Sequence, residues 1–203
     1  MIEFLKAEAR SGSEAFHDRG VAAGFELREF WSWGLSDLVG NTARGWLAEF
    51  IVAKALAVST TRVRQEWAAT DLTTADGLKI EVKSAAYVQS WSQTRLSAVQ
   101  FGVKPTKGWN PETNASAPLA SRSADIYVFA LLAHRDKRSI DPLNLDQWRF
   151  FVLSTATVNE HCGRQKTISL GPLERIAGAP VEFGGIAAAV RRALDSGTAR
   201  APA

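Results

Sequence analysis

The sequence predicts an α/β protein in which a central mixed β-sheet is flanked by helices. Three observations support this prediction. Residues 41–58 contain no proline and are typical of a helix, and short segments of alternating apolar and polar residues follow them. Residues 124–133 are almost continuously apolar, which indicates a strand buried on both faces. Helical and strand-like segments in this order are typical of helices packed against a sheet.

The size and composition describe one soluble domain. The chain has 203 residues, of which 46% are hydrophobic and 22% charged, as in an ordinary globular protein. We predict a single domain over residues 1–203, with a core at about residues 41–154 and a disordered tail at residues 195–203. The net charge of +3 and the pI near 9.2 permit a nucleic-acid partner without requiring one.

Cysteine usage and hydropathy bear on the compartment. Cys162 is the single cysteine, which excludes an internal disulfide and fits a reducing cytoplasm. The N-terminus lacks a signal-peptide pattern, and no apolar run has the length of a membrane span. We therefore expect a cytoplasmic protein without a membrane partner, and a homodimer is left open.

Residues 1–40 are predicted to form a helical N-terminal extension. Residues 1–24 are polar and contain several glycines, which favours a short helix and a loop. Aromatic residues at 25–33 indicate a short helix packed against the rest of the protein. Asn41 is a good N-cap for the stronger helix that follows.

Residues 71–83 are predicted to form a β-hairpin, because two alternating runs flank an Asp-Gly turn signal. A two-residue loop would mix polar and apolar side chains on each face. A three-residue loop with Gly77 at positive φ instead places Asp71 opposite Glu81 and separates the two kinds of side chain. One face then carries Asp71, Thr73, Lys79, Glu81 and Lys83, and the other carries Leu72, Leu78, Ile80 and Val82. This separation favours the three-residue loop.

The predicted register brings two carboxylates together. Opposed side chains lie about 5 Å apart at Cβ, and like charges at that distance are unfavourable unless a cation or proton lies between them. Lys83 lies on the same face as Asp71 and Glu81. Two carboxylates and an ammonium suit a hard divalent cation, Mg²⁺ or Mn²⁺. A solvated hairpin face with alternating charges would show the same pattern, so the hairpin alone leaves both interpretations open.

Two motifs carry a resemblance to a known superfamily. Asp71, followed ten residues later by Glu81-Val82-Lys83, resembles the D…(E/D)-x-K signature of the PD-(D/E)XK, or restriction-endonuclease-like, nucleases, although Thr70 replaces the usual proline before the aspartate. Upstream, Gly45 and Glu49 resemble the G-x-x-x-E helix of the Holliday-junction-resolvase-like branch. The alternative for Glu49 is a helix-margin glutamate paired with a neighbouring cation.

The resemblance implies a fold, a cofactor and residue roles. It implies a restriction-endonuclease-like core and a Mg²⁺- or Mn²⁺-dependent endonuclease or exonuclease that acts on DNA. Asp71, Glu81 and the Val82 carbonyl would hold the metal, and Glu49 would complete the site. Lys83 would orient or deprotonate the attacking water. A catalytically inactive module of the same fold, which binds nucleic acid or a partner protein, is the alternative.

The rest of the chain supplies candidate nucleic-acid contacts. Gln89 resembles a polar residue that often follows the E-x-K strand, and a strand-end glutamine explains it equally. Residues 105–123 lack periodicity and are a long loop, which is either a DNA-contacting arm or an inert insertion. The candidate contacts are Arg44, Gln89, Lys104 and Lys107. Further predicted elements are strands at 62–67, 97–104, 147–154 and 167–170 and helices at 155–160, 171–176 and 185–194.

Other chemistries lack support. His17, His134 and His161 are the only histidines, and none lies in a nucleophile motif or in a complete zinc-ligand pattern. No glycine-rich phosphate-binding motif occurs, so no nucleotide cofactor is expected.

Overall fold

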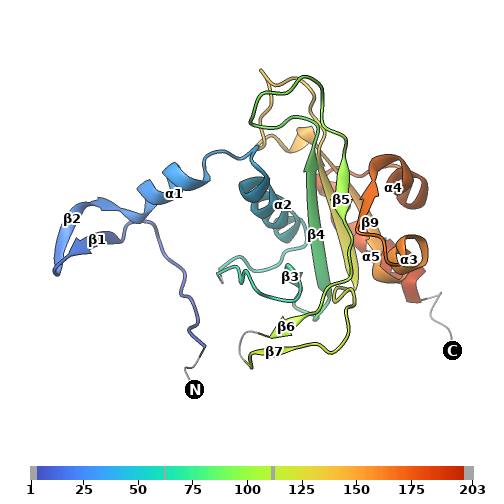
Figure 1. Cartoon of the computed structure of the whole chain (residues 1–203), viewed down its shortest axis with the longest axis horizontal. Coiled ribbons are helices and arrows are strands. Elements are labelled where there is room, and N and C mark those ends of the chain that lie inside the picture. The colour runs from blue at the N-terminus through green and yellow to red at the C-terminus, as the bar shows by residue number, and fades with distance from the viewer. Residues whose placement is uncertain (1–3, 62, 111–112, 199–203) are drawn as a thin grey trace.

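The computed structural model describes residues 4–61, 63–110 and 113–198. Its centre is a four-stranded sheet in the order β3-β4-β8-β9 (Figure 1). The strands are β3 (Leu72–Thr73), β4 (Lys79–Ala86), β8 (Ile126–Leu132) and β9 (Trp148–Ser154). β4 runs antiparallel to β3 and parallel to β8, and β9 runs antiparallel to β8. The predicted α/β architecture with a central mixed sheet is therefore confirmed.

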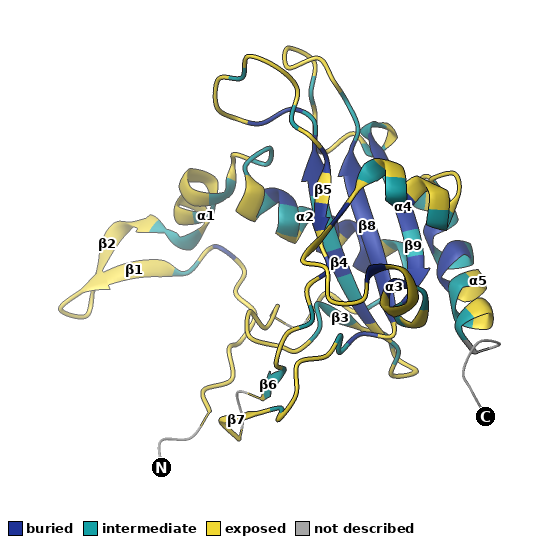
Figure 2. Cartoon of the chain, turned by 45° about the vertical axis from the view of Figure 1, so that its right-hand side comes forward, coloured by how far each residue is buried: buried dark blue, intermediate teal, exposed yellow. Residues whose placement is uncertain are grey.

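Helices cover both faces of this sheet. The face that carries Ile80 and Val82 packs against α2 (Asn41–Ala55) and α5 (Ile186–Thr198). The face that carries Tyr127 and Phe129 packs against α3 (Thr155–Cys162), α4 (Leu170–Ala177) and a separate ladder of β5 (Gln100–Gly102) with β10 (Thr167–Ser169). All of β8 is buried (Figure 2), as its apolar run predicts. Ser154 caps α3, since its side chain accepts a hydrogen bond from the Thr157 amide.

The N-terminal region differs from the prediction. Residues 15–26 form a hairpin of β1 (Ala15–Asp18) and β2 (Val21–Glu26) instead of a helix and a loop. Its turn has both central residues, Arg19 and Gly20, at positive φ, and arginine there is a weak turn signal. The aromatic helix exists as α1 (Leu27–Leu35), but none of its residues is buried, and it projects away from the sheet (Figure 1). Its predicted packing against the body is wrong.

Three boundary predictions also need correction. Gly40, not Asn41, precedes the first turn of α2, because the Asn41 carboxamide accepts a hydrogen bond from Arg44 instead of capping the helix. Of the strand predicted at residues 62–67, residues 63–67 form no strand, and residue 62 lies outside the described residues. At the C-terminal end α5 extends to Thr198, so residues 195–198 of the predicted tail are helical, and residues 199–203 lie outside the described part of the chain.

The long loop at residues 105–123 has some structure of its own. It contains the short strands β6 (Trp109–Asn110) and β7 (Ala115–Ser116), which pair antiparallel. Two 3₁₀ turns, Leu145–Gln147 and Phe183–Gly185, complete the fold. None of the helices in the described residues is long and apolar enough to cross a membrane.

Candidate active site

The β3–β4 hairpin has the predicted register. Leu72 pairs with Ile80 and Thr73 with Lys79, so Asp71 occupies the position opposite Glu81. The loop is the three-residue one: the Gly77 amide donates to the Thr74 carbonyl at 3.0 Å, and Gly77 has a φ of +87°. Glycine tolerates this conformation without a steric cost. The polar and apolar faces therefore separate as the sequence indicates.

Asp71 lies where the strand pairing stops. One of its carboxylate oxygens, Oδ2, accepts a hydrogen bond from the Val82 amide at 2.8 Å, in the place of a partner strand. The side chain is only 18% exposed. Because the N–H and C=O of one strand residue point to the same side, the Val82 carbonyl also faces this open edge of the sheet. The structure thus brings Asp71 and the Val82 backbone together.

Glu81 and Lys83 form a half-buried ion pair on the same face of β4. Their Nζ and Oε1 atoms lie 2.5 Å apart, and the side chains are 32% and 19% exposed for Lys83 and Glu81 respectively. Burial raises the pKa of Glu81, and the nearby Asp71 raises that pKa further, while Lys83 opposes the rise. Glu81 lies beside Tyr127 on β8. Burial is the main cause that raises the pKa of Tyr127 to about 12, and the negative charge of Glu81 is the second cause.

Glu49 reaches the same place from the opposite face of the sheet. It projects from α2 and is 8% exposed. β3 is only two residues long, so it leaves part of the edge of β4 uncovered. A side chain from α2 can extend past this uncovered edge. Burial raises the pKa of Glu49; Asp71 raises that pKa further and Lys83 lowers it. Glu49, Asp71 and Lys83 are therefore near enough for their charges to act on one another.

Arg64 is a member of this cluster that the sequence analysis missed. Its Nε and Nη2 atoms donate to the two oxygens of Glu49 at 2.5 and 2.8 Å, and Nη2 lies 3.9 Å from Asp71 Oδ1. The residue follows α2 in the segment predicted as a strand at residues 62–67, and no functional motif marks it. The one available signal is electrostatic: three clustered carboxylates with a single lysine need another cation nearby.

The four residues predicted to contact nucleic acid differ in their exposure to solvent. Arg44 and Gln89 are 4% and 6% exposed, and the Arg44 guanidinium donates to Val39, Asn41, Ser84 and Gln89. These two side chains tie α2 to β4 and do not face solvent. Lys104 and Lys107 are exposed. Lys107 lines the same cavity as Asp71 and Glu81, which is described next.

A cavity of about 640 Å³ opens beside the carboxylates. Asp71, Glu81 and Lys107 form part of its wall. Trp67 and Trp109 also line it, and their rings meet edge to face with centroids 6.1 Å apart. The lining of the cavity therefore combines two carboxylates with an exposed cation and large aromatic side chains.

The donor chemistry of the cluster fits a hard divalent cation, since its ligands would all be oxygens. Asp71, Glu81 and the Val82 carbonyl face one edge of the sheet. However, no group of three or more Asp, Glu, His or Cys side chains is gathered tightly enough to hold a metal among the described residues. Two of the carboxylates are instead paired with cations: Arg64 contacts Glu49, and Lys83 contacts Glu81.

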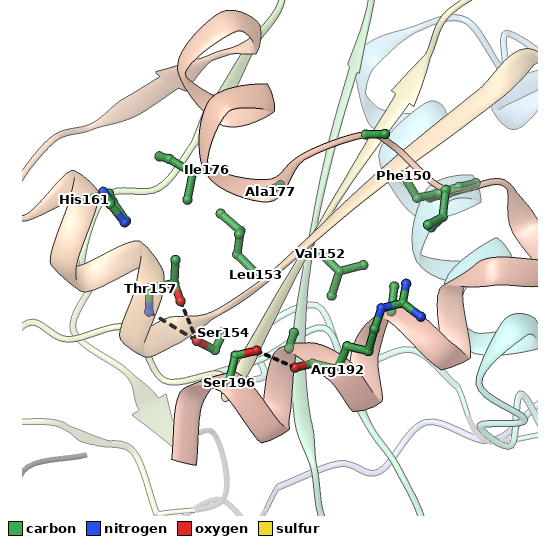
Figure 3. A pocket seen from close by; sticks show the side chains of 14 residues that line it. Phe150, Val152, Leu153, Ser154, Thr157, His161, Ile176, Ala177, Arg192 and Ser196 are labelled. Atoms are coloured by element: carbon green, nitrogen blue, oxygen red, sulfur yellow. Dashed lines mark hydrogen bonds between the residues drawn. The ribbon is translucent and has the colours of Figure 1, made fainter. Parts of the chain in front are cut away.

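A second cavity, of about 410 Å³, lies between β9, α3, α4 and α5 (Figure 3). Its hydroxyl groups are engaged locally: Ser154 bonds to Thr157, and the Ser196 hydroxyl donates to the Arg192 carbonyl. No carboxylate lines it. This cavity lacks the acidic cluster that marks the β3–β4 edge.

An α/β sheet that gathers half-buried carboxylates, a lysine and an arginine beside an open cavity has the features of a hydrolytic enzyme site. A family model described as bacteriophage T4 endonuclease IV matches residues 33–171, which is more than half of the chain. The chain belongs to this family, and the predicted nuclease class is confirmed at that level. The matched region includes α2, the β3–β4 hairpin and both later strands of the sheet. No curated protein and no solved structure matches the chain.

Proposed function

We propose that this protein is a metal-dependent nuclease that hydrolyses DNA phosphodiester bonds by a PD-(D/E)XK mechanism. One observation carries the proposal: Asp71 stands opposite Glu81 in the hairpin register, with Lys83 bonded to Glu81 and Glu49 approaching from α2. Membership of an endonuclease family supports the same activity. Family-level names and sheet topology alone do not specify a mechanism.

The carboxylates would hold the cation. Asp71 and Glu81, with the Val82 carbonyl, would ligate Mg²⁺ or Mn²⁺, and Glu49 would complete the site directly or through water. Asp71 is already fixed by the Val82 amide, so this one side chain would need little further ordering when the ion binds. When bound, the metal would supply Lewis acidity and neutralise charge that develops on the phosphate.

Lys83 would act on the attacking water. Its ammonium group lies next to Glu81 on the face that lines the reaction site. A cation there would orient the water, help to remove its proton and offset the negative charge of the pentavalent phosphorus transition state. The strand holds Lys83 in place, because its backbone is paired with Phe129 of β8.

The cavity would receive the substrate next to these groups. Lys107 would contact a backbone phosphate, and the faces of Trp67 and Trp109 offer apolar surfaces for nucleotide groups. We expect Trp109→Ala to raise KM about tenfold, while kcat changes less, because the ring lies in the cavity wall and not among the carboxylates.

Cleavage assays test the proposal. Plasmid, single-stranded and branched DNA would be incubated with Mg²⁺, and we expect the Asp71→Ala and Lys83→Ala variants to lose about 100-fold or more of the rate. Lys79→Ala is the matched control, because Lys79 lies on the same face of β4 but is exposed. The proposal fails if no substrate is cut with Mg²⁺, or if cutting survives both substitutions.

The inactive binding module stays as the second candidate, because Arg64 occupies Glu49 and the carboxylates are not gathered as a metal site in this conformation. Calorimetric titration with Mn²⁺ separates the two. A nuclease should show binding heat that disappears in Asp71→Ala. A binding module should show no such heat and should still retain DNA or a partner protein.

A further inference from the structure

Arg64 lies in the position of a cation between two of the carboxylates. Its guanidinium group makes a two-point contact with Glu49, at 2.5 and 2.8 Å, and its Nη2 atom is 3.9 Å from Asp71. This geometry uses both oxygens of Glu49. Each oxygen keeps a second lone pair, but a divalent cation that takes the place of the guanidinium on both oxygens must displace Arg64.

The contact is protected from water on one side. The Glu49 side chain is 11% exposed and that of Arg64 is 35% exposed. The Trp46 ring covers the guanidinium, whose carbon lies 5.7 Å from the ring centroid. A shielded ion pair competes better with other ligands than an exposed one, because solvent screens it less.

The segment that carries Arg64 is not tied into the sheet. Among residues 63–70 there is no helix or strand, and Ala68 N to Gln65 O at 3.3 Å is the backbone bond formed there. Glu49, by contrast, is fixed on a 15-residue helix packed against β4. Arg64 can therefore leave Glu49 without disrupting a ladder or a helix.

From these observations we propose that Arg64 is a positioning residue that competes with the divalent cation for Glu49 and Asp71. Arg64 closes the site when no metal is present, and metal binding displaces it. Formal charge favours the exchange: the three carboxylates, Lys83 and a dication are together neutral, whereas retention of Arg64 would leave an extra positive charge. The inference rests on the proposed metal-dependent function.

The competition makes a directional prediction about metal affinity. Removal of Arg64 should tighten binding, although it removes a contact from the site, because the apparent affinity is reduced by the fraction of molecules in the closed state. We expect Arg64→Gln to lower the Mn²⁺ dissociation constant about tenfold in calorimetric titrations. Arg64→Lys, which keeps the charge but loses the two-point contact, should lie between wild type and Arg64→Gln.

Arg138→Gln is the matched control. It removes the same charge from an exposed ion pair with Asp136, where the Arg138 side chain is 91% exposed, and it should leave Mn²⁺ affinity unchanged. Circular dichroism and thermal melting of each variant would establish that it is folded. A Glu49→Gln variant of the Arg64→Gln protein should lose the gain in affinity, since the released ligand is then absent.

A second readout follows Arg64 itself. The Nε–H proton NMR signal of Arg64, assigned by its loss in Arg64→Gln, should move towards the position of an unpaired arginine when wild-type protein is saturated with Mg²⁺. An unmoved signal at saturation, or a Mn²⁺ affinity that is equal or weaker in Arg64→Gln, would overturn the competition.

These outcomes are distinguishable from failure of the proposed function. Wild-type binding that depends on Asp71 but does not respond to Arg64→Gln overturns the role of Arg64 and leaves the metal site intact. Binding by no variant at all overturns both. Binding by Arg64→Gln but not by wild type supports the competition in its strongest form.

Discussion

The N-terminal arm exposes apolar side chains that are usually buried, whereas the β3–β4 edge buries charged side chains that are usually exposed. The arm, residues 4–35, leaves large apolar side chains in water: Phe30 is 50% and Trp33 85% exposed. The β3–β4 edge instead buries charge, with Glu49 at 8% exposure. Exposed aromatic residues contribute little to folding, whereas buried carboxylates oppose it. The two regions therefore bear on stability and on chemistry in different ways.

The charge distribution follows the same division. Residues 1–35 carry six acidic and four basic side chains, and residues 36–203 carry 15 acidic and 20 basic ones. The positive balance of the chain thus lies in the part that contains the sheet and the cavity. A polyanionic substrate would be attracted there and not to the arm.

The largest difference between the two regions should appear in stability. Trp148 of β9 is fully buried, and its indole N–H donates to the Pro142 carbonyl at 2.9 Å. Trp148→Ala should lower the free energy of unfolding by about 3–5 kcal/mol. Trp33→Ala in the arm should change it by less than about 0.5 kcal/mol. Urea titrations of the two variants measure this; a comparable loss for Trp33→Ala would show that the arm packs against something in solution.

Short-range patterns made much of the sheet and the hairpin predictable. The hairpin register follows from separation of polar and apolar side chains, and that alone places Asp71 opposite Glu81. The seven buried residues of β8 follow from one apolar run. In both places the periodicity is two residues and the determinants lie within a dozen positions.

What the sequence could not predict depends on contacts between distant segments. β5 pairs with β10, 65 or more positions away, instead of joining the main sheet. Arg64 meets Glu49 only because the chain after α2 folds back over the edge of β4. The prediction for the N-terminal arm was wrong for a different reason. The turn of its hairpin has Arg19 at positive φ, and arginine seldom adopts this conformation, so the sequence gives no sign of the turn.

The second difference concerns the titration of glutamates. Hydrogen bonds from the backbone amide of Ser11 and its neighbours lower the pKa of Glu14 in the arm to about 2. Burial raises the pKa of Glu49 and of Glu81 above their usual value of 4.5. NMR titration of the carboxyl carbons should find Glu14 still ionised at pH 4.5. The two site glutamates, Glu49 and Glu81, should still take up protons above pH 4.5.

The sign of the stability effect follows from these shifts. A glutamate with a raised pKa binds more protons when folded than when unfolded, so its contribution to stability is lost as pH rises from 4.5 through the folded pKa. The melting temperature should therefore fall over that window, and by less in Glu49→Gln or Glu81→Gln. Mg²⁺ should oppose the fall, because the proposed metal site requires the ionised form. A melting temperature that rises there in wild type and not in the variants would contradict the assignment.

The smallest difference compares two glycines in hairpin turns. Gly77 in the β3–β4 loop has φ +87° and Gly20 in the arm has φ +81°, and an added Cβ would meet no atom within 4 Å at either position. Alanine would therefore cause no steric clash at either position. At both positions it would strain the backbone, by about 1 kcal/mol. Gly77→Ala should lower the unfolding free energy by about this amount and weaken metal binding, since the turn sets the register that opposes Asp71 and Glu81. Gly20→Ala should leave both unchanged, because the arm hairpin buries no residue of β1 or β2. Equal losses of stability would mean that the arm unfolds together with the sheet.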